Sequence, residues 1–306
     1  MPDHPETILI AGGSGYVGSR LIPRLAGGSS QVRCLARNPA AMKSRPEGVE
    51  VVAGNVRDPG SLDRALSGVG TAYYLVHLMS DSKHFEEDDR RAARNFAEAA
   101  RRAGVRRIVY MGGLGDDLDP RLSPHLRSRH EVGQILRESD AEVIEFRSSM
   151  IIGAGSLSYD MLKDLTERLP VMLCPRWLST KTQPIAVEDV LGYLVAARDR
   201  PAGRSRVYEV GGPDVVTFMD LIREYARQKS LRRVLIPVPF LTPWYSGLWL
   251  ALVTPSRFAV GRHLIEGLIN PTIVRDTAAL DDFPIRPKGV AESLELAIRG
   301  GDVRPS

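Results

Sequence analysis

The stretch ILIAGGSGYVGSRL, residues 8–21, decides the fold class of this 306-residue chain. Four apolar residues come first, and four glycines follow: Gly12, Gly13, Gly15 and Gly18. The order indicates a strand, a tight turn and then a helix. Glycines at this spacing let the chain turn sharply, bring the backbone close to a pyrophosphate and let the helix pack tightly on its strand. Because the free N–H groups at the helix start face an anion, the stretch predicts a dinucleotide-binding site.

Strand and helix patterns alternate through the first half of the chain. Strands are expected over residues 7–11, 31–36, 49–53, 69–76, 105–111 and 141–146. The helices between them are expected after Gly15, from Pro59, and over residues 83–103 and 124–138. This alternation predicts an α/β protein with a Rossmann-type, doubly wound parallel sheet covered on both faces. Ligands bind such a sheet at the carboxyl ends of its strands, where the strand order reverses.

The second half of the chain is less regular. Helices are expected over residues 159–169, 187–197, 218–229 and 290–298, and strands over 183–185 and 207–210. A Trp- and Pro-rich segment, residues 237–255, lies between the last two of these helices. Three interpretations of that segment stay open: the wall of an apolar pocket, the core of a small lobe, or an exposed patch that faces a partner.

The composition is that of a globular protein, with 43% hydrophobic and 25% charged residues. The net charge of +4 is spread over arginine-rich helix faces, so no nucleic-acid partner is expected. Cys34 and Cys174 form no C-x-x-C motif, and no metal site is expected. Since the N-terminus does not resemble a signal peptide and no apolar run reaches the length of a membrane span, we expect a cytoplasmic location with at most peripheral membrane contact.

Two expected strand ends carry residues that suit the adenosine half of a dinucleotide. Arg37 stands at the end of the second strand, where an acidic residue would bind the ribose 2′-OH of NAD. An arginine accommodates a 2′-phosphate instead, so NADP(H) is expected ahead of NAD(H); the alternative is a solvent-exposed arginine. Asn55 follows the third strand, where a polar residue can face the adenine, with a local turn as the alternative. Asp58 is expected to cap the helix that Pro59 opens.

Seven segments of the chain carry a resemblance to a known family. They are AGGSGYVGSRL, CLARNP, AGNVRDPGSL, RNFAEAARRAGV, RRIVYMGGLG, EVIEFRSSMIIGAGS and QPIAVEDV. With them the chain resembles an atypical or extended short-chain dehydrogenase/reductase, and YLVH, GGLG, SPHLRSR and LPVMLCPRW resemble its NmrA-like, NAD(P)H-binding branch. The resemblance implies a Rossmann domain over residues 1–155, completed by a strand near 207–211. It also implies a smaller, partly interleaved substrate lobe over residues 156–306.

The resemblance implies roles for individual residues as well. Six residues are expected at the cofactor phosphates: Gly12, Ser14, Gly15, Tyr16, Val17 and Gly18. Arg37 is expected at the 2′-phosphate, and Asn55 with Val56 on the adenine side. Near the nicotinamide and its ribose the resemblance places His77, Gly112 and Gly113.

The chain departs from the wider superfamily where catalysis is expected. Short-chain dehydrogenases use a serine and a Tyr-x-x-x-Lys pair, in which the lysine lowers the pKa of the tyrosine. In SPHLRSRHEVG, aligning the lysine position with Arg129 places His125 where the tyrosine belongs, and Gly113 stands where the serine would follow the fifth strand. His125 and Arg129 share one helix face, and a histidine can donate a proton near neutral pH. The alternative for His125 is a polar residue without catalytic duty, while Arg129 suits a phosphate or a substrate carboxylate.

Two more charged residues have roles that the sequence leaves open. Arg147, at the end of the sixth strand, either braces the substrate or pairs with an acid below the site, and the second role is favoured. Asp189 in AVEDV resembles the family's structural acid at a strand–helix corner.

The leading functional hypothesis is NADPH-dependent reduction of an apolar carbonyl, enone or quinone-like small molecule, with His125 as proton donor. The absent Ser-Tyr-Lys set favours a rival, a non-catalytic NADP(H)-binding redox sensor or assembly protein. A weaker alternative is an isomerase. We expect a monomer or a homodimer, and the sequence names no particular substrate.

Overall fold

The computed structural model describes residues 6–28, 30–42, 46–78, 84–238 and 269–302. Within these ranges a seven-stranded sheet forms the centre of the molecule, in the order β11-β6-β5-β4-β1-β2-β3. Every neighbouring pair in it is parallel, as predicted. Its strands are β1 (Thr7–Ala11), β2 (Gln31–Ala36), β3 (Glu50–Ala53), β4 (Val69–Tyr74), β5 (Arg107–Gly113), β6 (Glu142–Ser148) and β11 (Arg206–Val210). The order reverses between β1 and β4, so the glycine turn after β1 lies at the switch point.

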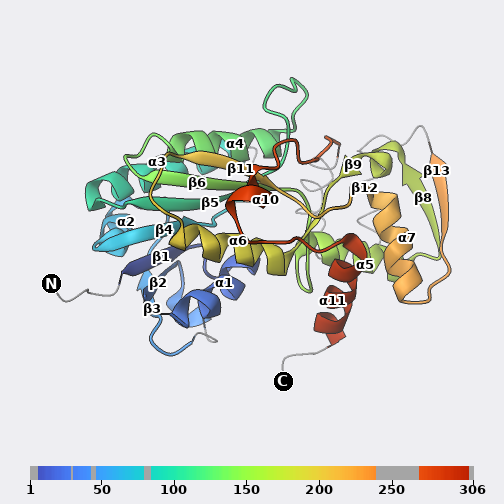
Figure 1. The fold of residues 1–306 in the computed structure, drawn as a ribbon, viewed down its shortest axis with the longest axis horizontal. Coiled ribbons are helices and arrows are strands. Elements are labelled where there is room, and N and C mark those ends of the chain that lie inside the picture. Colours follow the sequence, from blue (N-terminus) through green and yellow to red (C-terminus); the bar gives the residue numbers. More distant parts are fainter. Residues whose placement is uncertain (1–5, 29, 43–45, 79–83, 239–268, 303–306) are drawn as a thin grey trace.

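Helices cover both faces of this sheet, which confirms the doubly wound arrangement (Figure 1). On one face lie α1 (Tyr16–Ala26) and α6 (Val187–Asp199). The other face carries α2 (Pro59–Leu66), α3 (Phe85–Ala103) and α4 (Pro124–Leu136). Because successive strand residues point to opposite faces, the strands are apolar on both sides and each face has its own buried core.

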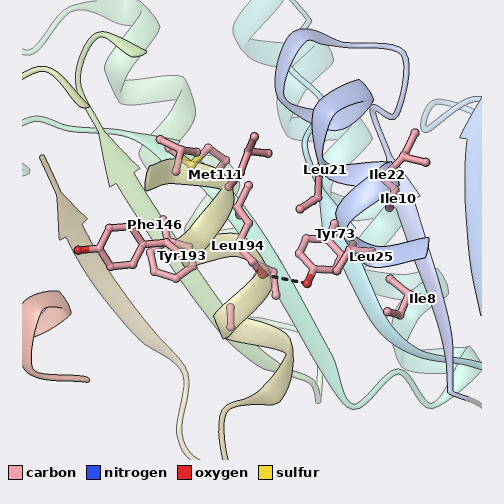
Figure 2. Packing of buried hydrophobic residues seen from close by; sticks show 14 of the residues in the cluster. Ile8, Ile10, Leu21, Ile22, Leu25, Tyr73, Met111, Phe146, Tyr193 and Leu194 are labelled. Carbon is pink, nitrogen blue, oxygen red and sulfur yellow. Dashed lines mark hydrogen bonds between the residues drawn. The ribbon is translucent and has the colours of Figure 1, made fainter. Parts of the chain in front are cut away.

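Figure 2 shows the core under α1 and α6. Ile8 and Ile10 of β1 belong to the same buried cluster as Leu21 of α1. On β4 the Tyr73 ring is fully buried, and its hydroxyl donates a hydrogen bond of 2.9 Å to the Leu194 carbonyl of α6. This bond satisfies a phenol that would otherwise lie buried without an acceptor.

A separate buried cluster lies at the end of the molecule farthest from β3 (Figure 1). Its main helices are α5 (Leu157–Arg168), α7 (Phe218–Gln228) and α11 (Val290–Asp302). Three strand pairs flank them: β7 (Ile151–Ile152) with β10 (Ile185–Ala186), β9 (Lys181–Thr182) with β12 (Val216–Thr217), and β8 (Val171–Pro175) with β13 (Val234–Val238). Short 3-10 turns η1 (Pro39–Ala41) and η2 (Arg176–Ser179) and the short helix α10 (Ala278–Asp282) complete the described elements.

Short-range sequence patterns predicted several helix boundaries correctly. Asp58 accepts a hydrogen bond of 3.1 Å from the Gly60 N–H and caps α2, whose first residue is Pro59. Gly104 ends α3 in the left-handed region with φ +68°, a conformation that glycine adopts without strain.

Other predicted boundaries were wrong. β5 runs on to Gly113 instead of ending at Met111, because Gly112 and Gly113 still pair with β6. β4 stops at Tyr74. Of the strand expected over 183–185 only Ile185 lies in a strand, β10, and the other two residues lie between β9 and β10. β8 and β13 were missed because prolines beside and within them obscure the strand pattern.

The Trp- and Pro-rich segment lies outside the described residues from position 239 onward, so its three interpretations stay open. No helix in the described ranges is long and apolar enough to cross a membrane.

Candidate functional site

The turn after β1 has the geometry of a cradle that only glycine permits. Gly12 has φ +94°, and a Cβ there would lie 2.7 Å from the backbone carbonyl of Leu75. A Cβ on Gly18 would overlap the Gly12 carbonyl oxygen, so the glycine lets α1 approach the turn. Gly15 closes the turn by donating its N–H to the Gly12 carbonyl over 3.0 Å.

The start of α1 suits an anion. Its N-cap is Gly15, which has no side chain to cap the N–H groups of the first turn, and that turn contains no acidic residue. Ser14 and Gly15 are exposed beside it. The cradle and this helix start together fit the pyrophosphate of a dinucleotide. Six residues predicted to bind the phosphates therefore lie in one place: Gly12, Ser14, Gly15, Tyr16, Val17 and Gly18.

Tyr16 connects this turn to the cavity described below. Its hydroxyl is buried, and burial, with smaller contributions from Asp160 and Glu188, raises the pKa of Tyr16 to about 12 against the opposing charge of Arg20. The phenol is therefore protonated at neutral pH, unlike the activated tyrosine of a Tyr-x-x-x-Lys pair.

Arg37 follows β2 at the same edge of the sheet, since β2 pairs with β1 over Ala11 and Leu35. Its side chain is exposed and forms no hydrogen bond or ion pair with any residue in the described ranges. The next residue, Asn38, caps η1 by accepting the Ala40 N–H over 3.1 Å. The chain turns after Arg37, and within the described ranges its guanidinium is exposed and suited to an anion.

Asn55 has a structural task within its own turn. Its side-chain oxygen accepts the Arg57 N–H over 3.1 Å, and its backbone N–H donates to the Ser61 hydroxyl over 3.0 Å. The neighbouring Val56 is buried, and its carbonyl accepts the Asn95 amide of α3 over 3.2 Å. The turn interpretation therefore holds for the Asn55 oxygen, and a contact of Asn55 or Val56 with adenine stays a prediction.

A cavity of about 330 Å³ opens beside the glycine turn. Its wall is mostly apolar and comes from the ends of β4, β5 and β6, from α4, and from the segment around α5 and α7. Five residues predicted for the nicotinamide end or for catalysis line it: His77, Gly112, Gly113, His125 and Arg129. Its apolar side chains include Met111, Leu114, Leu126, Met150, Ile151, Leu157, Met161 and Phe218. An apolar pocket with a few convergent polar groups is the usual form of a small-molecule site.

Two histidines meet at one wall of the cavity. The rings of His77 and His125 lie edge to face, with centroids 4.7 Å apart. The carboxylate of Asp89, on α3, lies 3.7 Å from the Nδ1 atom of His77. Sequence reasoning missed Asp89, although it shares the helical spacing of the buried Ala92, Ala93 and Phe96 on the same face.

Arg129 is tied to the sheet. Its guanidinium donates to the Met111 carbonyl of β5, and its own carbonyl accepts the Tyr110 hydroxyl over 2.8 Å. The arginine at the lysine position therefore connects α4 to the end of β5 and still lines the cavity.

A side chain at position 113, where the serine is missing, would meet Leu126. A Cβ on Gly113 would lie 2.7 Å from the Leu126 Cδ2 atom, because α4 packs its first turn directly over the end of β5. A serine side chain does not fit at this position unless Leu126 moves.

A Gly113→Ser variant is therefore expected to be less stable by about 1–3 kcal/mol, because the new side chain forces Leu126 out of its packed position. Urea unfolding measures the difference. The double variant Gly113→Ser/Leu126→Ala should lose less than the sum of the two single variants, since the smaller residue removes the collision. Strictly additive losses would contradict this explanation.

A buried group of charged residues lies below the cavity, between β6 and α4. Glu145 is fully buried and pairs with Arg137 and, over 2.7 Å, with Arg147. Arg147 also forms an ion pair with Asp117 over 2.7 Å. The interpretation favoured from the sequence, that Arg147 pairs with an acidic residue, therefore agrees with the structure. Although burial opposes it, hydrogen bonding to Arg147 and the charge of His130 lower the pKa of Asp117.

His130 connects this group to the cavity wall. Its Nε2 atom lies 2.9 Å from the Gly113 carbonyl, and its Nδ1 atom contacts Asp117. Burial and the neighbouring Arg147 lower the pKa of His130. Asp189, the other residue with an open role, is likewise structural: it pairs with Lys288 over 2.8 Å and accepts the Lys288 backbone N–H over 2.7 Å.

Comparison with known proteins agrees with this site. Residues 12–152 match the sequence profile of an NAD(P)H-binding domain. The chain is 30% identical over 226 residues to (4-alkanoyl-5-oxo-2,5-dihydrofuran-3-yl)methyl phosphate reductase of Streptomyces griseus, covering 72% of this chain and 73% of the relative. It is 29% identical over 269 residues to ceramide reductase of Caulobacter vibrioides, covering 85% and 84%.

A solved structure has the same fold. Triphenylmethane reductase of Citrobacter sp., complexed with NADP(H), superposes with a TM-score of 0.75 at 18% identity, covering 95% of this chain and 99% of that one. The glycine cradle, the sheet order and the sequence relatives lead to one conclusion. This chain belongs to the NAD(P)H-binding, NmrA-like group of atypical short-chain dehydrogenases/reductases.

Proposed function

We propose that the protein is an NADPH-dependent reductase of an apolar carbonyl, enone or quinone-like small molecule. The observation that carries the proposal is the apolar cavity beside the glycine cradle, with His77 and His125 at its wall. The two relatives described above are reductases, and one is named for ceramide, a largely apolar molecule.

The cofactor would lie along the carboxyl edge of the sheet, with its phosphates at the start of α1. When bound, it supplies the hydride. Arg37 would hold the 2′-phosphate, and the turn at Asn55 and Val56 would flank the adenine. The nicotinamide end would lie beside Gly112 and Gly113, which line the cavity.

The substrate would lie in the apolar cavity with its reacting carbonyl toward His125. As the carbonyl carbon accepts a hydride, the C=O π bond opens and His125 gives its proton to the oxygen, so that an alcohol forms. For an enone or a quinone the same proton goes to the enolate or to the phenolate oxygen. Arg129 would support the charge that develops there.

We also propose how the chain is organised into two domains. Residues 1–155, completed by β11, would form the cofactor domain, and residues 156–306 the partly interleaved substrate lobe. The separate buried cluster around α5, α7 and α11 supports this division, since each unit then has its own core.

The experiment that tests the function is direct. The purified protein is titrated with NADPH and NADH, and the oxidation of each is then followed at 340 nm with quinones, enones, aldehydes and triphenylmethane dyes. Turnover of NADPH with at least one apolar acceptor is expected. Tight binding without turnover of any acceptor would favour the sensor or assembly role, conversion without net oxidation an isomerase, and no binding would refute the proposal.

Replacing Arg37 by Asp is expected to weaken NADPH binding by roughly 10–100-fold, because the variant loses a charge-assisted contact and places a carboxylate near the phosphate. Binding of NADH should be unchanged or tighter. Fluorescence titration of both cofactors measures the ratio. Arg94→Asp, an exposed charge reversal on α3, is the matched control for net charge and should keep the wild-type ratio. An Arg37→Asp variant with wild-type preference would refute the assigned role.

A further inference from the structure

Asp89 is a buried carboxylate that faces the cavity wall, with 3% of its surface exposed. One of its oxygens accepts the Leu78 N–H over 3.1 Å, and the other accepts the Ser128 hydroxyl over 3.0 Å. This second oxygen is the one that lies 3.7 Å from the Nδ1 atom of His77. A carboxylate close to the Nδ1 atom of an imidazole stabilises its protonated form.

The next residue along α3 has a different environment. Asp88 pairs over 2.9 Å with Arg57, which precedes α2, and over 2.6 Å with Arg91 of α3, and both arginines are exposed. Asp88 therefore forms ion pairs at the surface, while its neighbour Asp89 points inward, behind His77. This difference supplies a matched control.

His77 in turn contacts His125. The two rings lie edge to face at 4.7 Å between centroids, and both line the cavity in which a substrate would bind. The Asp89 carboxylate is buried behind this pair, and both imidazoles line the cavity. Two adjacent imidazoles share one proton more readily than they hold two, because the second charge is repelled by the first.

We propose that Asp89, His77 and His125 form the proton-donating group of the reductase. His125 is the member that touches the substrate, His77 shares the positive charge with it, and Asp89 is the positioning residue that stabilises that charge. The inference rests on the proposed function. In the reaction the substrate carbon gains a hydride, its oxygen gains the proton of the pair, and the neutral pair takes a new proton from water.

Within the described ranges, the other titratable groups around the three residues are Arg129 of α4, Asp88 of α3, and three tyrosines: Tyr16, Tyr74 and Tyr110. Burial raises the pKa of all three phenols, so they carry no charge at neutral pH. Burial also raises the pKa of Asp89, while hydrogen bonds from Leu78 and Ser128 oppose that rise by favouring the carboxylate. The carboxylate thus has the donors it needs to remain the counter-ion of the pair.

The test is a histidine titration of the whole protein by NMR, with His77 and His125 assigned from their glutamine variants. Asp89→Asn keeps both hydrogen bonds, because its oxygen accepts from Leu78 and its amide donates to the Ser128 hydroxyl after that group reverses. It removes only the charge. We expect the titration midpoint of the pair to fall by about one pH unit. Asp88→Asn should leave it unchanged.

Activity provides the second measurement. With an acceptor identified for the wild type, Asp89→Asn should lower kcat/KM by roughly tenfold or more above neutral pH and move the basic limb of the pH profile to lower pH, while NADPH affinity is unchanged. His125→Gln should lower kcat by about 100-fold or more. An unchanged midpoint in Asp89→Asn, or an equal shift in Asp88→Asn, would overturn the proposal.

The NMR result does not depend on turnover, so a failure of the reductase function and a failure of this inference remain distinguishable. If Asp89→Asn does not fold, Ser128→Ala takes its place. That variant removes one of the two donors that favour the Asp89 carboxylate, so the counter-ion is weakened and the midpoint of the pair should fall; a rise would overturn the inference.

Discussion

A Gly18→Ala variant is expected to bind NADPH roughly 100-fold or more weakly than the wild type, a loss of about 2.7 kcal/mol. The added Cβ would overlap the Gly12 carbonyl oxygen and lie 2.9 Å from the Gly13 Cα atom. Since α1 must move away from the turn to relieve this overlap, the N–H groups at its start no longer meet the pyrophosphate. The displaced helix also costs stability, by about 1–3 kcal/mol.

Gly27→Ala is the matched control for this variant. Gly27 ends the same helix with φ −74°, which alanine adopts easily, and a Cβ there would lie 3.7 Å from the nearest atom. Cofactor affinity and the thermal midpoint should both stay close to wild type. Calorimetric titration with NADPH measures the cofactor affinity, and a thermal melt measures the midpoint of unfolding. If Gly18→Ala binds as tightly as Gly27→Ala, close packing at position 18 does not build the cofactor site.

A Glu145→Gln variant is expected to lower the free energy of unfolding by about 3 kcal/mol or more. Glu145 is fully buried between Arg137 and Arg147, so removing its charge leaves two guanidinium groups with less compensation inside the protein. Position 133 on α4 is a glycine, and a Cβ there would overlap the Glu145 carboxylate. The thermal midpoint should fall by roughly 6 °C or more.

Glu98→Gln is the control for Glu145. Glu98 lies on α3 with 62% of its side chain exposed, and its ion pair with Arg102 spans 4.0 Å. Its loss should change the free energy of unfolding by about 0.5 kcal/mol or less, because exposed pairs contribute little. Equal effects of the two variants in urea unfolding would contradict the assigned burial of the Glu145 pairs.

The parts of the fold that depend on local chemistry could be predicted from the sequence. The run from Ile8 to Leu21 specified a strand, a turn and a helix because glycine spacing and apolar periodicity act over a few residues. The cap at Asp58 and the helix end at Gly104 followed from the same kind of short-range preference.

The parts that depend on packing between distant segments could not be predicted. No sequence pattern shows that Leu126 lies over Gly113, so the collision of a serine at position 113 with Leu126 could not be predicted. The cavity wall from Met150, Met161 and Phe218 comes from segments whose mutual placement the sequence does not state.

Charged residues illustrate the same limit. Acidic residues at the start of α3 are expected, because they stabilise the positive end of the helix dipole. The sequence therefore gives no reason to single out Asp89, which the structure shows to be buried. Val143, Glu145 and Arg147 alternate along β6, which marks one face of the strand, but only the structure pairs that face with α4.

The most direct test of the central claim is the ratio of NADPH to NADH affinity of the wild-type protein at physiological ionic strength. The glycine cradle with Arg37 at the end of β2 predicts that NADPH binds about tenfold or more tightly than NADH, because only NADPH carries the 2′-phosphate. Equal affinities, tighter binding of NADH, or no binding of either would contradict the account.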